Sequence, residues 1–109
     1  MLASSSLIQA ASDCAAACDF CASSCIREGD AEQMKECIRL DLDCADLCRL
    51  VASLAARDSG FVARLARDLA EVCEACATEC SKHEQNHTQQ CALACHRCAT
   101  ACRVIAAAS

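Results

Sequence analysis

The chain has 109 residues, a length that suits a single domain, and it carries a formal net charge of −5. This charge argues against nucleic-acid binding, as does the lack of a basic stripe with interleaved aromatic residues. With no proline, two glycines, two phenylalanines and 14 cysteines, the composition is typical of an all-helical protein without an aromatic core.

The predicted elements are long helices separated by three short breaks. Gly29 is typical of a helix C-cap, and Asp30 of the N-cap of a following helix. A second break of the same kind ends at Gly60, and a polar stretch without aliphatic residues covers 81–90. Short connections between helices of about 30–40 Å predict an all-α domain, an antiparallel up-down-up-down four-helix bundle over 1–109. The predicted helices, in chain order, are 5–28, 31–57, 60–83 and 86–107.

The cysteines recur at intervals of three, four and seven residues, which place them on one face of each predicted helix. Leucine usually fills such positions in a helical bundle. Cysteine could act there as a small hydrophobic residue, but 14 of them would leave costly voids unless metal ions filled the space. The candidate ligands are Cys14, Cys18, Cys21, Cys25, Cys37, Cys44, Cys48, Cys73, Cys76, Cys80, Cys91, Cys95, Cys98 and Cys102.

The cysteine stripes are not spread evenly along the predicted bundle. In an antiparallel arrangement the break at Gly29 and the break at 81–90 lie at the same end, and all four stripes begin there. Cys14 and Cys48 lie deepest, roughly 20–28 Å from that end by helical rise. Ordinary apolar residues continue the stripes at the opposite end. These residues are Leu7, Val51, Val62, Leu69 and Ile105.

Copper(I) fits this pattern better than the other metals that thiolates select. Structural zinc sites are closed sets of four ligands, and iron–sulfur clusters take four cysteines each, whereas these stripes are continuous. A monovalent ion replaces each thiol proton one for one, so a filled core stays near neutral. With thiolates bridging between ions, we expect on the order of a dozen copper(I) ions per chain, which indicates storage rather than catalysis. No nucleophile–base pair or phosphate loop indicates an enzyme.

Four other residues are candidate ligands. His83, His87 and Met34 fall on the cysteine faces at the end where the stripes begin, and imidazole and thioether bind copper(I). We interpret them as a transfer relay; the alternative is solvated histidines and a methionine in ordinary packing. Asp41 lies in line with the second stripe. A buried carboxylate needs a partner, so Asp41 binds copper, accepts a bond from a thiol, lies at the stripe's edge or pairs with an arginine. His96 is predicted to lie at the surface.

Three segments carry a family resemblance. They are CEACATECSKH (73–83), CALACHRCATACR (91–103) and LDLDCADLC (40–48). Together they resemble the bacterial copper storage proteins, over essentially the whole chain. The resemblance implies a four-helix bundle, copper(I) held by core cysteines, histidines near the open end, a homotetramer, and a role in holding or detoxifying copper. One departure is Gln90, since family members often have a histidine directly before the first cysteine of the fourth helix.

The first twelve residues lack a cationic region, a twin arginine and a continuous apolar run, so we expect a cytoplasmic protein that resembles the cytosolic class of the family. In that reducing compartment cysteines serve as metal ligands more often than as disulfides. Two alternatives stay open: zinc bound by the same thiols, and a thiol redox buffer, which needs an exposed cysteine of low pKa. A stripe of Leu40, Leu47 and Leu54 forms an oligomer interface or packs against a neighbouring helix.

Overall fold

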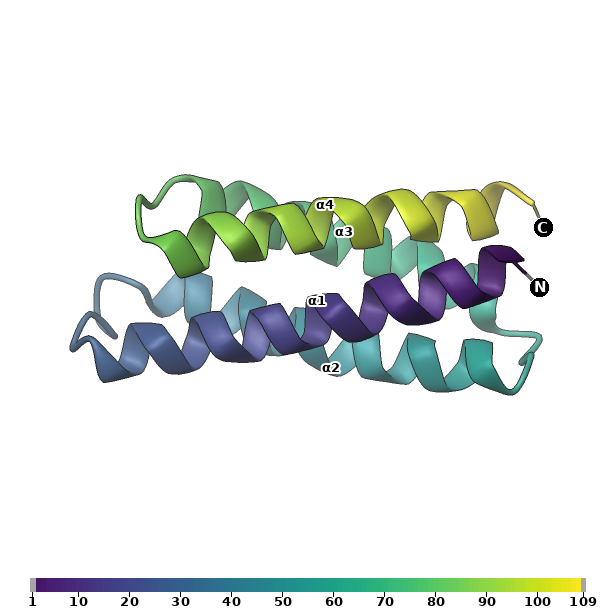
Figure 1. Ribbon diagram of the computed structural model, residues 1–109, viewed down its shortest axis with the longest axis horizontal. Helices are drawn as coiled ribbons and strands as arrows, with labels where there is room; N and C mark the ends of the chain where they lie inside the picture. Colours follow the sequence, from purple (N-terminus) through teal and green to yellow (C-terminus); the bar gives the residue numbers. More distant parts are fainter. Residues whose placement is uncertain (1, 109) are drawn as a thin grey trace.

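The protein, here a computed structural model that describes residues 2–108, is built of four long α-helices (Figure 1). No strand occurs between these residues, so the predicted all-α fold is confirmed. The helices end within a few residues of their predicted limits, except at the start of the second helix. They are α1 (Leu2–Arg27), α2 (Lys35–Ala56), α3 (Val62–Ser81) and α4 (Asn86–Ala107).

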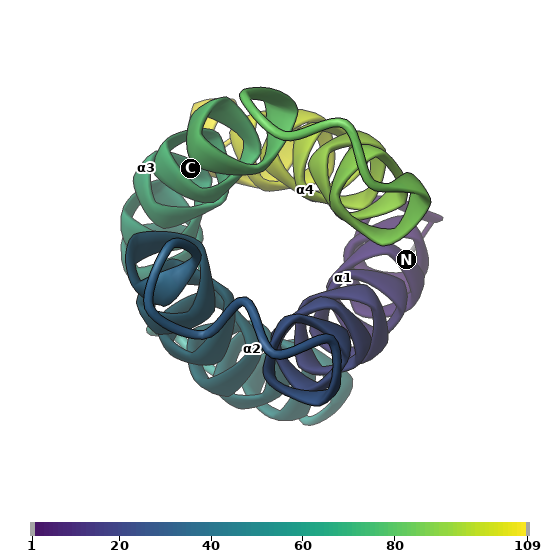
Figure 2. The same cartoon turned by 90° about the vertical axis from the view of Figure 1, so that its left-hand side faces the viewer.

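The helices form an antiparallel square bundle with principal extents of 42 × 19 × 18 Å. Each helix contacts its two neighbours, α1 with α2 and α4, and α3 with α2 and α4 (Figure 2). Connections 28–34 and 82–85 meet at one end, which we call the two-loop end (Figure 1). Connection 57–61 and both chain ends lie at the other, the apolar end. The up-down-up-down order follows from the short connections, as predicted.

The first connection shows why α2 begins later than predicted. Gly29 adopts a left-handed conformation, with φ of 78°, and donates its N–H to the Ile26 carbonyl, while Asp30 donates to the Cys25 carbonyl. This pair of bonds is the Schellman motif, so Gly29 ends α1 as expected. The predicted N-cap at Asp30 is wrong. The Asp30 carbonyl accepts the Met34 N–H at 2.9 Å, which closes a separate turn, and Met34 holds the N-cap position.

The second connection has the same motif with a different residue. Asp58 has a φ of 54° and donates its N–H to the Ala55 carbonyl at 3.1 Å, and Ser59 donates to the Leu54 carbonyl at 2.9 Å. The predicted glycine cap at Gly60 is therefore wrong. Aspartate adopts the left-handed conformation more readily than most residues, because its short polar side chain can form local hydrogen bonds. Asp58 therefore ends α2 two residues before the glycine.

The core of the apolar end consists of the aliphatic residues predicted for it. Leu7, Val51 and Leu69 are fully buried, and Val62 and Ile105 are partly buried against them. These side chains give the bundle a conventional hydrophobic core at this end. None of the helices that the structure describes is long and apolar enough to cross a membrane.

Candidate metal centre

All 14 cysteine side chains face the bundle axis. Each has zero solvent exposure, and each is a free thiol. We call this set the thiol core. The inward orientation was predicted from the helical spacing, and it is confirmed for every cysteine, because residues three, four and seven positions apart share one helix face.

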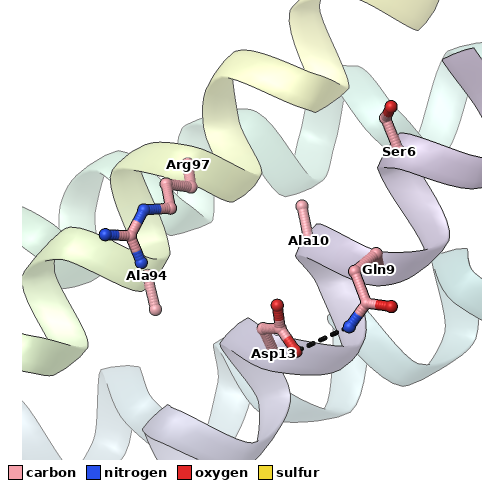
Figure 3. A pocket seen from close by; sticks show the side chains of 6 residues that line it. All are labelled: Ser6, Gln9, Ala10, Asp13, Ala94 and Arg97. Atoms are coloured by element: carbon pink, nitrogen blue, oxygen red, sulfur yellow. Dashed lines mark hydrogen bonds between the residues drawn. The ribbon is translucent and has the colours of Figure 1, made fainter.

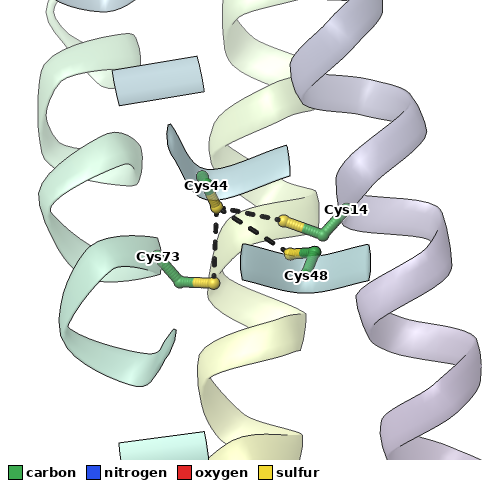
Figure 4. Close-up of side chains that lie close together, drawn as sticks. All are labelled: Cys14, Cys44, Cys48 and Cys73. Carbon is green, nitrogen blue, oxygen red and sulfur yellow. Dashed lines mark hydrogen bonds between the residues drawn. The ribbon is translucent and has the colours of Figure 1, made fainter. Parts of the chain in front are cut away.

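The deepest part of the thiol core brings together sulfurs from three helices. Cys44 Sγ lies 3.8 Å from Cys14 Sγ, 3.7 Å from Cys73 Sγ and 4.0 Å from Cys48 Sγ (Figure 4). With a metal–sulfur bond of about 2.3 Å, as for thiolate-bound zinc, three sulfurs around one ion lie about 4.0 Å apart. The observed separations therefore suit an ion with three sulfur ligands without rearrangement of the helices.

The sulfur groups are continuous along the bundle. Cys14 Sγ also lies 3.7 Å from Cys95 Sγ, and Cys18 Sγ lies 3.6 Å from Cys91 Sγ, so one group leads to the next. In each four-residue group below, the ligand atoms all lie within 4.8 Å of one another. These groups include Cys14, Cys44, Cys48 and Cys73; Cys14, Cys18, Cys44 and Cys95; Cys18, Cys76, Cys91 and Cys95; Cys21, Cys37, Asp41 and Cys80; and Asp41, Cys76, Cys80 and Cys91.

Asp41 lies inside the thiol core with zero solvent exposure. Its Oδ1 accepts from the thiols of Cys76 at 3.1 Å, Cys91 at 3.2 Å and Cys80 at 3.5 Å, and its Oδ2 accepts from Cys37 at 3.8 Å. The alternatives of a position at the stripe's edge and of an arginine partner are wrong. The alternative of an acceptor for thiol hydrogen bonds is confirmed.

The buried position changes the protonation of these groups. Burial raises the pKa of Asp41 to about 8. Burial also raises the pKa of the Cys25 thiol to about 11. Both shifts favour the neutral form, which suits a core from which water is excluded.

The two histidines of the proposed relay lie at the two-loop end, each beside a carboxylate. His83 Nε2 lies 3.0 Å from Glu79 Oε2, and His87 Nε2 lies 3.0 Å from Glu28 Oε1. The hydrogen bond from His83 lowers the pKa of Glu79. The His87 side chain is only 8% exposed, so the alternative of a solvated histidine fails for this residue.

Met34 and His96 differ in burial. Met34 is 3% exposed and belongs to the core, at the N-cap position of α2. That position agrees with both readings of this residue, a ligand and ordinary packing. His96 is exposed, as predicted.

Thr88 and Glu28 were not predicted from the sequence. Thr88 is fully buried, and its hydroxyl donates to the Gln85 carbonyl at 2.8 Å and the His83 carbonyl at 3.2 Å. These bonds hold the 82–85 connection. The Thr88 hydroxyl donates to carbonyls instead of accepting a backbone N–H as a helix cap does, so no capping signal in the sequence marks it. Glu28 lies 59 residues from its partner His87, a separation for which no sequence spacing gives a signal.

The outer surface carries a groove between α1 and α4 that is separate from the thiol core. Within it the Gln9 side chain donates to Asp13 Oδ1 at 2.8 Å (Figure 3). Its lining contains no sulfur, so this groove is not part of the metal centre. The lining residues are Ser6, Gln9, Ala10, Asp13, Ala94 and Arg97.

Comparisons with known proteins agree with this geometry. Residues 2–107 match the family of copper storage proteins. The cysteine-rich protein YhjQ of Bacillus subtilis strain 168 is 43% identical over 104 residues, which cover 95% of this chain and 96% of the relative.

Two solved structures are similar over nearly all of the chain. The Cu(I)-bound copper storage protein BsCsp3 superposes with a TM-score of 0.91 at 42% identity, over 95% of this chain and 98% of the other. A cytosolic copper storage protein from Streptomyces lividans, solved with five coppers, gives a TM-score of 0.92 at 35% identity, over 96% and 92% of the two chains. With its cysteine-lined four-helix bundle and these matches, the chain belongs to the copper storage protein family.

Proposed function

We propose that this protein stores copper(I), many ions per chain, on the thiolates of its core cysteines in the cytoplasm. The observation that carries the proposal is the continuity of the thiol core, in which sulfurs such as those of Cys14 and Cys18 each belong to two neighbouring four-residue groups. Copper(I) accepts few sulfur ligands and is suited to soft thiolates. The S. lividans relative has also been solved loaded with 10 copper equivalents. The proposed ligands are the 14 cysteines of the thiol core.

Proton balance supports copper(I) over zinc. Each thiol loses a proton when it binds a metal ion, and one monovalent ion per proton leaves the buried core without added charge. Zinc favours separate closed sites of four ligands, but Cys14, Cys18 and Asp41 each belong to two of the overlapping groups. Zinc is thus the weaker alternative, because filling one site would remove ligands from the next.

The burial of the thiols argues against a redox buffer or enzyme. A reactive cysteine needs partial exposure and a lowered pKa, whereas all 14 cysteines have zero exposure. Family membership points to storage rather than catalysis, and we propose that the protein is not an enzyme.

Asp41 is proposed as an oxygen ligand within the thiol core. It belongs to one group with Cys21, Cys37 and Cys80, and to another with Cys76, Cys80 and Cys91. Loss of its proton would let the carboxylate bind an ion that neighbouring thiolates also hold. One carboxylate would thereby serve both groups.

His83, His87 and Met34 are proposed as the relay through which copper(I) enters and leaves at the two-loop end. The support is their shared location at this end and the affinity of imidazole and thioether for soft metal ions. Replacing both histidines with alanine should slow uptake and removal without changing capacity. Unchanged rates would contradict the relay.

A homotetramer is proposed for the assembly. Large apolar side chains on α1, α2 and α4 are about half exposed, including Phe20 at 59%, Ile26 at 58% and Val104 at 54%. An apolar surface of this kind favours association. The Leu40 and Leu47 side chains instead pack partly against the core, so the leucine stripe contributes to the packing between helices. Sedimentation velocity of the reduced protein tests the assembly.

A competitive titration tests the storage function. The fully reduced protein is titrated with copper(I) against a chelator of known affinity, and bound copper is counted per chain. We expect saturation near one ion per cysteine, on the order of a dozen ions. Saturation at about three or four ions would indicate discrete sites of the zinc type and contradict storage. A parallel titration with zinc should reach a lower limit.

A further inference from the structure

We propose that Glu28 is a positioning residue for His87, and that this pair presents the imidazole Nδ1 to copper(I) passing the two-loop end. The inference rests on the proposed storage function, and adds to it a carboxylate that neither the sequence pattern nor the family match assigns. Its basis is a contact between the 28–34 connection and α4, and a buried nitrogen atom without a hydrogen-bond partner.

The contact joins Glu28, the residue directly after α1, to the first turn of α4. His87 Nε2 lies 3.0 Å from Glu28 Oε1, although the two residues are 59 positions apart in the chain. The His87 side chain is 8% exposed and that of Glu28 is 44% exposed. The carboxylate therefore lies on the solvent side of the pair, and the imidazole lies on the protein side.

The other ring nitrogen of His87 has no partner. Among the side chains that the structure describes, His87 Nδ1 is the one buried nitrogen or oxygen atom without a hydrogen bond. An ionised carboxylate only accepts hydrogen bonds, so Nε2 carries the proton that Glu28 accepts in the neutral imidazole. Nδ1 then carries the free lone pair, which is the form that binds a metal ion.

The position of the pair relates this lone pair to the thiol core. His87 lies one helical turn before Cys91, the first cysteine of α4, and Glu28 lies three residues after Cys25, the last cysteine of α1. The pair therefore stands where the α1 and α4 stripes reach the two-loop end.

The arrangement has a known physical consequence. A metal-binding histidine that donates its second N–H to a carboxylate is held in one tautomer and one orientation, and loss of that carboxylate typically costs 10–100-fold in affinity or activity. His83 has a different arrangement, because its partner Glu79 lies only four residues earlier in the chain, near the end of α3. Of the two histidine–carboxylate contacts at the two-loop end, the Glu28 contact is the one that joins segments far apart in the chain.

The test compares Glu28→Ala and Glu28→Gln with the matched control Glu32→Gln. Glu32 lies in the same connection, has a side chain that is 86% exposed, and pairs with Lys35 at the surface. Stopped-flow transfer of copper(I) from a chelator gives the uptake rate, and nitrogen NMR of the copper-free protein gives the His87 tautomer. We expect Glu28→Ala to slow uptake about 10-fold or more and to mix the tautomers. Glu28→Gln keeps an acceptor oxygen and should recover part of the rate.

The outcomes separate this proposal from the storage function. Equal slowing by Glu32→Gln would assign the effect to the charge of the connection and overturn the proposal. Wild-type rates and an unmixed tautomer in Glu28→Ala would overturn it as well. In a His87→Ala background, the Glu28 change should have no further effect. Total copper capacity should stay unchanged in every variant. A wild-type protein that fails to load copper would contradict the proposed storage function itself. The tautomer measurement needs no copper and so tests the pair in either case.

Discussion

Asp41 stands at a position of α2 where the helical spacing leads one to expect another cysteine. Four thiols surround it, and three of them donate to the same oxygen, Oδ1. A carboxyl group at this depth is most stable in its neutral form. Its protonation therefore links the pH of the solution to the stability of the copper-free fold.

The Asp41→Asn variant tests this link. The pKa of Asp41 rises from 3.8 to about 8 on folding, so the folded protein binds the proton more tightly than the unfolded chain. Folding stability from this group is full below about pH 4 and declines by up to about 1.4 kcal/mol per pH unit until about pH 8. The asparagine variant lacks this decline, so its stability relative to wild type should grow across that range.

Urea unfolding of the reduced, copper-free proteins at several pH values measures the difference. Asp43→Asn is the matched control, because Asp43 is exposed on the same helix. A stability difference between Asp41→Asn and wild type that stays constant with pH would refute the assignment of the titration to Asp41.

At the scale of the helices, the ends of α1 and α2 show how one backbone motif is made by two different residues. Gly29 and Asp58 both adopt positive φ, at 78° and 54°, and both ends have the paired bonds of the Schellman motif. Glycine adopts this conformation without steric cost, whereas a residue with a Cβ does so at some cost in free energy.

Substitutions at these two ends should therefore change stability in opposite directions. Gly29→Ala should lower the free energy of unfolding by about 1 kcal/mol, and Asp58→Gly should raise it by up to about 1 kcal/mol. A Cβ at Gly29 would meet nothing within 4 Å, so the loss comes from the backbone alone. Gly60→Ala is the control, since that site is also open but is not in the left-handed region. Denaturant unfolding measures all three, and equal effects at Gly29 and Gly60 would contradict the argument.

At the scale of the whole molecule, the two ends of the bundle differ in the side chains that fill the core. The apolar end supplies a conventional core through Leu7, Val51 and Leu69, and neutral thiols fill the rest. Small buried side chains such as Ala11 and Ala66 let the helices approach closely. We therefore expect that the fold does not depend on metal ligation in the way that the fold of a zinc finger does.

Removal of copper should leave the helices intact. We expect the far-ultraviolet circular dichroism of the protein to be the same before and after extraction of copper by a strong chelator under reducing conditions. The unfolding temperature should rise on loading, because ions bind the folded state and not the unfolded chain. Loss of helical signal on copper removal would show that the metal is needed for the fold.

Shortening one buried side chain at the apolar end should lower the stability of the fold without lowering the copper capacity. Leu69→Ala should lower the free energy of unfolding by about 2–5 kcal/mol, because Leu69 is fully buried at the end without cysteines. Copper capacity, counted by the competitive titration, should stay that of the wild type. A capacity that fell in proportion to stability would contradict the division between the two ends.

The sequence alone determined the helices, the inward cysteine faces and the separation of thiol and aliphatic ends, because these depend on local periodicity and on short connections. The tertiary structure decided what depends on contacts between helices. It placed Asp41 among thiols of α2, α3 and α4, and it brought Glu28 to His87 across 59 residues. The structure also shows Asp58, and not Gly60, as the left-handed residue, through backbone bonds local to the end of α2. Spacing within one helix fixes which face a residue occupies, but only packing sets the height at which side chains of different helices meet.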